Sequence, residues 1–257
     1  MLDKILNIPN LLCCWDFDRQ DAFVSKGRYA YTLLEGNGKN EIVDDGVLSS
    51  SSVQINESQY LYIPRELCTA LNISGKEAAV SVLAWVKRQP KSYVQCEAIA
   101  GMWNETKKLR QYCLFLNIRL YDSADQVCGH ISGVGGPTAG ERWCIDVSIG
   151  KQAVQHDEWK FIAFSYDGEY IRSYLDGVFD QRPGTNPYSY MEGIFDAGDD
   201  GSDFTVGAVD RGGEMGNYFV GQIGGLAIFD RALSPDEIRS IHNQFPLNNH
   251  LVSGRLK

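Results

Sequence analysis

The chain has 257 residues and a formal net charge of −9, with 44% hydrophobic and 22% charged residues. These proportions are ordinary for a globular protein. The acidic excess argues against a nucleic-acid partner, because a face that binds phosphates needs an excess of Lys and Arg. No apolar run approaches the length of a membrane span, so we expect no membrane partner either.

The N-terminus lacks the charged start, long apolar run and small-residue cleavage site of a signal peptide. The chain has seven cysteines, and none of them shows C-x-x-C spacing. Because seven is an odd number, at least one thiol is free in a monomer. We therefore expect mostly reduced, buried cysteines and a cytoplasmic protein, or a secreted one if a signal peptide has been removed.

Strand signals recur along the chain. The segment 80–86 is apolar on both faces and rich in Val, as is typical of a central strand. Asp167-Gly168 separates two further strand-like runs, and Asp176-Gly177 follows the second; Asp-Gly between such runs indicates a hairpin. The remaining predicted strands include 112–120, 126–131, 161–166, 170–175, 204–208 and 225–229.

One helix is predicted near the C-terminus. Ser234 and Glu237 have the spacing of a capping box, and Pro235 stands at the first helical position. Ile238 and Ile241 then begin an apolar stripe. With no internal repeat and no linker, the sequence predicts a single all-β domain over residues 1–257, a two-sheet antiparallel jelly-roll sandwich with one short C-terminal helix.

Four segments match a known family in the expected order. They are 14–18, 82–87, 157–177 and 221–234, the third with Trp159-Lys160-Phe161 and both Asp-Gly turns. Together they resemble the laminin-G-like jelly rolls of bacteria, which are concanavalin A-like domains. This resemblance implies a first strand near Trp15 paired with a last strand near Ile228. It also implies a concave face, which binds glycans in lectins and carries catalysis in glycanases and polysaccharide lyases.

The chain departs from its relatives at two places. Gly224-Gly225 stands where many relatives carry an acidic pair, so a calcium site of that kind is in doubt. The paired carboxylates of the glucanase branch are not recognisable, because Glu141, Glu158 and Glu169 lack the spacing that would place two of them at one glycosidic bond.

A second potential calcium site is the acidic loop 196–203, since hard cations bind clustered oxygens; the alternative is an ordinary turn-rich loop. It lacks the Glu that closes an EF-hand loop, because Gly207 stands there. We expect no other cofactor.

Strand parity selects the candidate site. In each predicted strand the aliphatic side chains point to one face, and the polar or aromatic side chains point to the other. We predict that His130, Asn117, Gln126, Arg172 and Tyr174 share one concave, solvent-reachable face. The candidate catalytic residues are His130, Tyr174 and Arg172, and the candidate substrate-binding residues on these strands are Asn117, Gln126, Arg119 and Tyr170. Two further candidates come from outside this pattern: Arg110 of the basic cluster 107–110, for which the alternative is a solvated loop, and Trp143, for which the alternative is a buried core residue.

These side chains support three classes of function. Amides, Arg and aromatic rings suit sugar recognition, so the first is a domain that binds an oligo- or polysaccharide. The second is a carbohydrate lyase or glycoside hydrolase that uses the same groove, with His130 as base or as partner of a uronate. The third is a laminin-G-like module that binds protein. Binding and catalysis stay open at this point.

Overall fold

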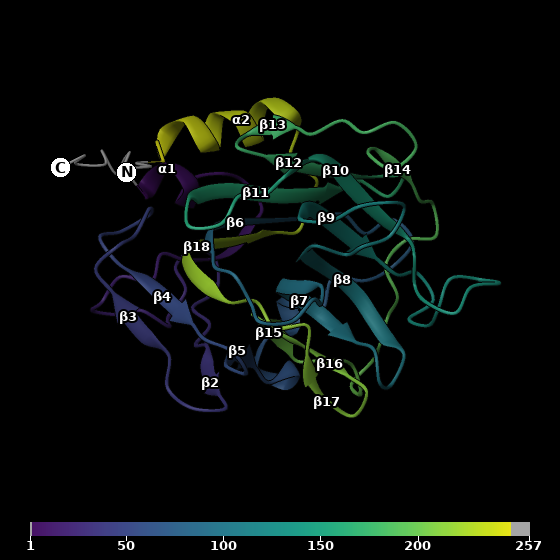
Figure 1. Ribbon diagram of the computed structural model, residues 1–257, viewed down its shortest axis with the longest axis horizontal. Coiled ribbons are helices and arrows are strands. Elements are labelled where there is room, and N and C mark those ends of the chain that lie inside the picture. Colours follow the sequence, from purple (N-terminus) through teal and green to yellow (C-terminus); the bar gives the residue numbers. More distant parts are fainter. Residues whose placement is uncertain (1, 248–257) are drawn as a thin grey trace.

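The computed structural model describes residues 2–247, and most of their regular structure is β-strand. The strands form two stacked sheets (Figure 1). The first sheet has the order β13-β12-β11-β6-β18-β4-β3, with β1 paired to β18 and β14 to β12. Its strands are β1 (Leu11–Trp15), β3 (Glu41–Val43), β4 (Ser52–Ile55), β6 (Val80–Arg88), β11 (Trp159–Tyr166), β12 (Tyr170–Leu175), β13 (Val178–Phe179), β14 (Tyr188–Ser189) and β18 (Gly221–Phe229).

The second sheet has the order β10-β9-β8-β7-β15-β5-β2. The hairpin of β16 and β17 joins it through a short parallel pairing of β16 with β7. Its strands are β2 (Leu34–Gly36), β5 (Tyr60–Ile63), β7 (Glu97–Asn104), β8 (Leu109–Leu116), β9 (Gln126–Ile131), β10 (Val147–Ala153), β15 (Phe204–Val206), β16 (Val209–Arg211) and β17 (Glu214–Gly216).

The predicted two-sheet antiparallel jelly-roll sandwich is confirmed. β1 pairs antiparallel with β18, and Cys13 lies opposite Ile228 in that pairing. The hairpin of β11 and β12 also forms as predicted. At the turn after β12, Asp176 and Gly177 have φ of 48° and 74°, the left-handed backbone that Asp-Gly accommodates. Residues 1 and 248–257 of the predicted domain lie outside the described residues.

The main core lies between the two sheets. Trp15 of β1 stacks on Phe204 of β15, with ring centroids 5.8 Å apart, and so joins one sheet to the other. Phe164 of β11 packs against Gly129 of β9, where an added Cβ would lie 2.6 Å from the Phe164 side chain. This contact allows the two sheets to approach closely at β9, the strand that also carries His130.

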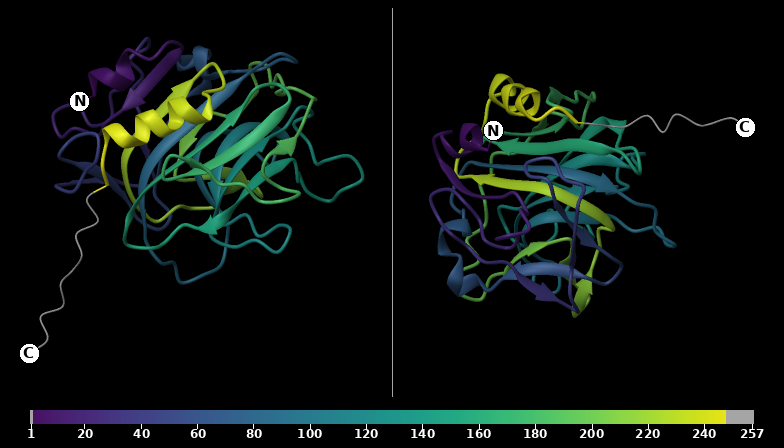
Figure 2. Two further views of the ribbon diagram at one scale, coloured as in Figure 1. Left: turned by 90° about the horizontal axis from the view of Figure 1, so that it is seen from above. Right: turned by 90° about the vertical axis from the view of Figure 1, so that its left-hand side faces the viewer.

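A smaller core covers the opposite face of the first sheet. There α2 (Pro235–Gln244) and α1 (Asp3–Leu6) pack against the sheet (Figure 2). The predicted capping box is present, since Ser234 and Glu237 exchange hydrogen bonds at the start of α2. Trp85 of β6 contacts Phe245 at 5.6 Å between centroids, just after the helix ends. Two short 3-10 helices, η1 (Arg65–Leu67) and η2 (Thr69–Leu71), follow β5.

All seven cysteines are free, as predicted, and six of them are buried. Desolvation raises the pKa of the Cys68 thiol to about 11, which keeps it protonated near neutral pH. No helix within residues 2–247 combines the length and the apolar character needed to cross a membrane.

Candidate functional site

The outer face of the second sheet carries the candidate site. Along β9, Val127 and Ile131 point into the main core, whereas Cys128 and His130 point outward. Trp103 of β7 and Phe115 of β8 lie on the same outer face and are buried there. The face is therefore largely covered, and only part of it is open to a ligand.

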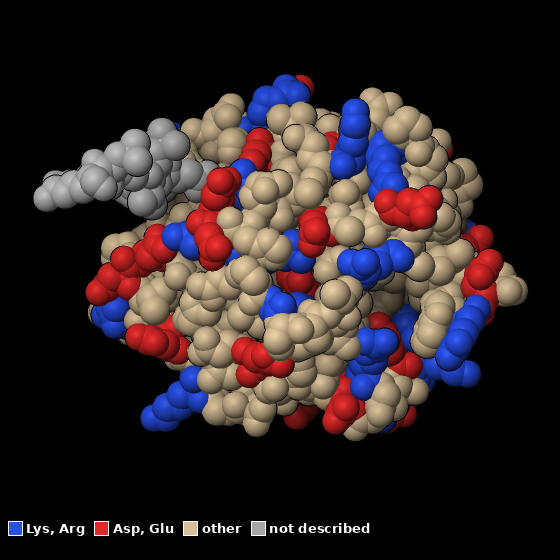
Figure 3. Space-filling view, in the orientation of Figure 1, with Lys and Arg blue, Asp and Glu red and all other residues tan. Residues whose placement is uncertain are grey.

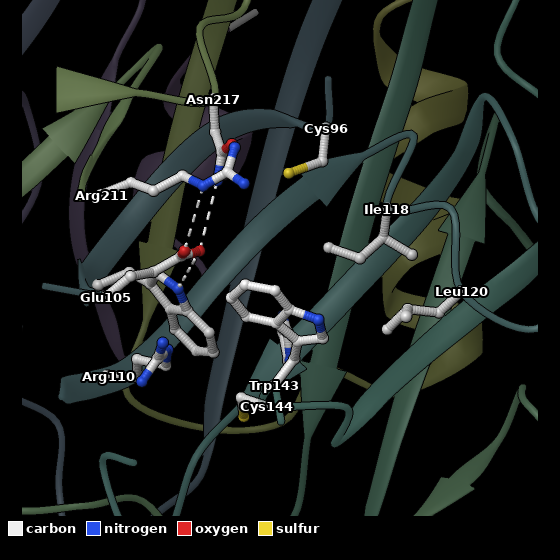
Figure 4. A pocket seen from close by; sticks show the side chains of 11 residues that line it. Cys96, Glu105, Arg110, Ile118, Leu120, Trp143, Cys144, Arg211 and Asn217 are labelled. Carbon is white, nitrogen blue, oxygen red and sulfur yellow. Dashed lines mark hydrogen bonds and ion pairs between the residues drawn. The ribbon is translucent and has the colours of Figure 1, made fainter. Parts of the chain in front are cut away.

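The open part is a pocket of about 310 Å³. It lies between the outer face of β7, β8 and β9, the β16-β17 hairpin, and the loops that follow β8 and β9. In the space-filling view, a hollow with Lys and Arg side chains above and below it lies in the right half of the molecule (Figure 3). Eleven residues line the pocket (Figure 4): Cys96, Trp103, Glu105, Arg110, Ile118, Leu120, His130, Trp143, Cys144, Arg211 and Asn217.

One wall of the pocket is polar. The Arg211 Nε atom lies 3.6 Å from Glu105 Oε2, and Arg211 Nη1 donates a 2.9 Å hydrogen bond to Asn217 Oδ1. Glu105 Oε1 also accepts hydrogen bonds from Asn217 Nδ2 and Trp103 Nε1, both at 3.3 Å. In Figure 4 these groups gather on one side, and Ile118 and Leu120 lie on the other. The pocket thus offers hydrogen-bonding groups facing an apolar wall.

His130 is held in the pocket lining by aromatic contacts. Its side chain is nearly fully buried, with Trp103 at 4.4 Å and Phe115 at 5.8 Å between ring centroids. Neither ring nitrogen has a hydrogen-bond partner among the described residues. Desolvation, aided by the charge of Arg110, lowers the pKa of His130 to about 3, although the Cys144 backbone acts weakly in the opposite direction. His130 is therefore neutral near pH 7.

Arg110 of β8 also lines the pocket, next to His130 and Trp103. Its side chain is 6% exposed, and its guanidinium lies over the Trp103 ring at 5.9 Å from the centroid. The Nη1 atom donates a hydrogen bond to the Gly135 carbonyl oxygen at 3.1 Å. No carboxylate within residues 2–247 forms an ion pair with it.

Trp143 stands at the rim of the pocket, on the loop after β9. Its side chain is 51% exposed, and the Arg142 guanidinium lies 4.7 Å from the centroid of its ring. The exposed ring borders a pocket that also has polar groups. The ring can therefore pack against the apolar face of a bound molecule.

Comparison with known families agrees with this architecture. The family described as the concanavalin A-like lectin/glucanases superfamily matches residues 56–239, which is more than half of the chain. The chain belongs to this superfamily. A comparison with curated protein sequences gave no significant match.

Solved structures show the same concanavalin A-like fold. Domain 4 of AbnA, a GH43 extracellular arabinanase from Geobacillus stearothermophilus, in complex with arabinotriose, is 15% identical with a TM-score of 0.58; the match covers 91% of this chain and 98% of that one. The binding domain of botulinum neurotoxin serotype G is 12% identical with a TM-score of 0.55, covering 91% and 51%. A botulinum neurotoxin type C structure, whose title reports cell entry dependent on two ganglioside molecules, is 10% identical with a TM-score of 0.56, covering 95% and 53%. The chain thus spans about half of each neurotoxin chain.

Three of the predicted site residues meet in this concanavalin A-like domain: His130, Arg110 and Trp143 all line the pocket. The prediction that His130 is reachable by solvent is wrong, because its side chain is buried and both ring nitrogens are covered. Asn117 and Gln126 lie nearby but do not line it. Asn117 Oδ1 accepts a hydrogen bond from the Asp125 backbone, and Gln126 Oε1 accepts one from the Ala124 backbone. These two amides therefore hold the loop after β8, and Arg119 of that loop is exposed.

The prediction that Arg172 and Tyr174 share this face is wrong. Both lie on β12 of the first sheet, and Tyr174 is buried in the small core under α2, where its hydroxyl lies 3.2 Å from Ser165 Oγ. Arg172 pairs with Asp167 at 2.5 Å and lies over the Tyr170 ring at 5.1 Å. Strand parity correctly placed both side chains on the face of β12 that points away from the main core, but β12 belongs to the first sheet and the pocket lies on the second.

Eight of the eleven lining residues had no role in the predicted site: Cys96, Trp103, Glu105, Ile118, Leu120, Cys144, Arg211 and Asn217. Four of them, Cys96, Glu105, Arg211 and Asn217, could not be found from periodicity because they lie at strand ends or in loops. Asp210 of β16 pairs with Asn104 of β7, and this single bridge brings the hairpin beside Glu105.

The acidic loop 196–203 is organised by a buried arginine. Arg65 Nε donates a 2.6 Å hydrogen bond to the Gly198 carbonyl oxygen, and Nη1 donates a 3.2 Å hydrogen bond to that of Ser202. Asp203 accepts a hydrogen bond from the Arg65 backbone. Within residues 2–247, no group of three or more His, Cys, Asp or Glu side chains could hold a metal ion.

The glycine pair at 224–225 is tightly packed. An added Cβ would lie 2.9 Å from the Trp159 ring at Gly224 and 2.5 Å from Leu48 at Gly225. Side chains larger than glycine therefore do not fit here without rearrangement.

Proposed function

We propose that the chain is a carbohydrate-binding domain and that a sugar occupies the pocket on the outer face of the second sheet. The observation that carries the proposal is the half-exposed Trp143 ring at the rim of a pocket with a polar wall and an apolar wall. The axial C–H groups of a sugar ring pack on an aromatic face, while its hydroxyls require planar hydrogen-bonding groups. Asn217, Glu105 and Arg211 offer such groups opposite Ile118 and Leu120.

The size of the pocket and the fold support this proposal. A volume of about 310 Å³ lies at the lower end of the range for small-ligand sites, about 300–1,000 Å³, and suits one or two sugar rings. Domain 4 of AbnA, which has the same fold, was solved in complex with arabinotriose, so this kind of sandwich can carry an oligosaccharide site.

Binding is favoured over catalysis by the chemistry of the lining residues. Glycoside hydrolysis requires two carboxyl groups across one bond, and Glu105 is the single carboxylate among the eleven lining residues. Glu105 is also engaged by Arg211, Asn217 and Trp103. A lyase base titrates best near the working pH, whereas the pKa of His130 is lowered to about 3.

Titration calorimetry with a panel of neutral and acidic oligosaccharides tests the proposal. Trp143→Ala should weaken the binding of any sugar that binds by about tenfold or more, because the aromatic platform is lost. Met191→Ala is the matched control, since Met191 is equally exposed, at 54%, but does not line the pocket. An absence of binding across the panel, binding unaffected by W143A, or steady release of unsaturated products would each contradict a binding domain of this kind.

A further inference from the structure

The buried arginines of the protein differ in how their charge is compensated. Among residues 2–247 the buried arginines are Arg65, Arg88 and Arg110. Arg88 forms two hydrogen bonds with Glu97, at 2.9 and 2.8 Å, and an ion pair with Asp125 at 2.7 Å. Arg65 has no ion pair, but its guanidinium donates to four oxygen acceptors, from Gly198, Ser202, Gln111 and Asn72. Both side chains are thus saturated within the fold.

Arg110 is the exception. Its guanidinium has five N–H donors, and among the described residues one oxygen accepts from it, the Gly135 carbonyl. Leaving a charge out of water without a partner is costly, so a buried arginine is normally paired or fully hydrogen-bonded. The aromatic face of Trp103 compensates only part of this cost.

Two nitrogen atoms of this guanidinium have no hydrogen-bond partner among the described residues and keep some access to solvent. The bond to Gly135 uses Nη1, which leaves Nε and Nη2. Neither of these atoms is among the fully covered polar atoms without a partner, and Arg110 lines the pocket. Nε and Nη2 form one side of the planar fork, the geometry that holds both oxygens of a carboxylate.

The surroundings of Arg110 add no competing anion. His130 beside it is uncharged at neutral pH and has no hydrogen-bond partner. Glu105 is held on the polar wall by Arg211 and Asn217. The exposed Lys107 and Lys108 precede Arg110 on the turn between β7 and β8, and make this end of an acidic protein locally basic.

We infer that the ligand of the pocket is an acidic sugar of the uronic acid kind, whose carboxylate binds side-on to Nε and Nη2 of Arg110. This inference rests on the proposed carbohydrate-binding function and names its substrate class. The sugar ring then extends toward Trp143 at the rim, and its hydroxyls meet the polar wall of Glu105 and Asn217.

Calorimetry with chemically matched ligands tests this inference. The probes are oligomers of galacturonate, glucuronate and mannuronate, each compared with its carboxyl-reduced form, which keeps the ring configuration and has a neutral CH2OH group in place of the carboxylate. At least one acidic oligomer should bind more than tenfold tighter than its reduced form, because charge-assisted hydrogen bonds to a buried Arg are lost in the reduced sugar. Sulfated neutral oligomers form a further arm, and tighter binding of the sulfate esters would overturn the carboxylate assignment.

Variants of Arg110 connect the preference to one side chain. Arg110→Gln should remove the preference for the acidic form, and Arg110→Lys, which keeps the charge but not the fork, should retain only part of it. Arg239→Gln is the matched control, because Arg239 is exposed on α2 and does not line the pocket. Near-UV circular dichroism verifies that each variant is folded. If a variant does not fold, the comparison of acidic and reduced sugars on the wild-type protein still tests the preference for a carboxylate.

The two proposals fail in different ways. If acidic and reduced sugars bind equally and W143A weakens both, the carbohydrate-binding function stands and the acidic-sugar assignment is overturned. If no sugar binds, both are overturned. If the preference for the acidic form survives in R110Q, the carboxylate is bound elsewhere and the assignment to Arg110 is refuted.

Discussion

Acidification should destabilise the protein through His130, and the variant that removes this effect is His130→Asn. In the folded chain, burial lowers the pKa of His130 from 6.5 to about 3. In the unfolded chain the ring titrates near 6.5, so between these two values the unfolded state binds a proton that the folded state does not. Stability is therefore lost as the pH falls from about 6.5 toward 3, and no further loss from this group occurs below that.

The size of the effect follows from the difference in pKa. Each pH unit below the unfolded value costs about 1.4 kcal/mol, so at pH 4.5 the loss from His130 is about 2.7 kcal/mol. This is a large part of the roughly 5–15 kcal/mol that stabilises a typical domain. Urea denaturation followed by Trp fluorescence at pH 7.0, 6.0, 5.0 and 4.5 measures it as the free energy of unfolding.

The carboxylates titrate equally in wild type and variant, so the comparison between them isolates His130. Wild type should lose about 2–3 kcal/mol more than H130N between pH 7.0 and 4.5. His156→Asn, at an exposed position, should follow the wild-type curve. Parallel curves for wild type and H130N would mean that the folded protein protonates His130 readily, and would refute its buried, neutral state.

Three further outcomes follow from the contacts described above. Arg172→Ala should leave sugar affinity unchanged in calorimetry, because Arg172 lies on the first sheet and the pocket lies on the second. It should lower the free energy of unfolding by less than about 1 kcal/mol in urea denaturation, because the ion pair with Asp167 is partly exposed. A loss of sugar binding would show that β12 contributes to the site. Ser234→Ala should lower the free energy of unfolding by about 1 kcal/mol through loss of the helix cap, and an unchanged denaturation midpoint would show that the capping box contributes nothing. Gly129→Ala should cost about 1–3 kcal/mol because its Cβ would meet the Phe164 side chain, and equal stability would mean that the sheets can separate there without penalty.

The fold could be predicted from local signals because each of them has a direct physical cause. Asp176-Gly177 takes the left-handed backbone of a tight hairpin, and Ser234 and Glu237 satisfy the free N–H groups at the start of a helix. Turn and capping preferences depend on residues that are close together in the sequence, so they can be recognised without knowing the tertiary structure.

The candidate site was only partly predictable. Strand parity shows which side chains share one face of a strand, but it does not show which of the two sheets the strand joins. In β9 the alternation is regular, and His130 points to the pocket as predicted. The predicted strand 112–120 ends at Leu116, and Asn117 and Arg119 have φ of 57° and 60°, so the alternation stops and Ile118 faces the pocket. For Arg172, parity was correct, but nothing local shows which of the two sheets β12 joins.

The position of β18 has a consequence for how the chain acquires this structure. β18 lies between β6 on one side and β1 and β4 on the other, so β1, β3 and β4 connect to the rest of the first sheet through the last strand. β1 and β4 can therefore pair with the rest of this sheet only once Gly221–Phe229 is in place, although β3 and β4 pair with each other locally. Such a high separation in sequence makes folding slow, because the entropy of closing a long loop is lost before the contacts form. During synthesis on the ribosome, β1 cannot pair with β18 until Gly221–Phe229 has emerged, so this part of the first sheet is completed late.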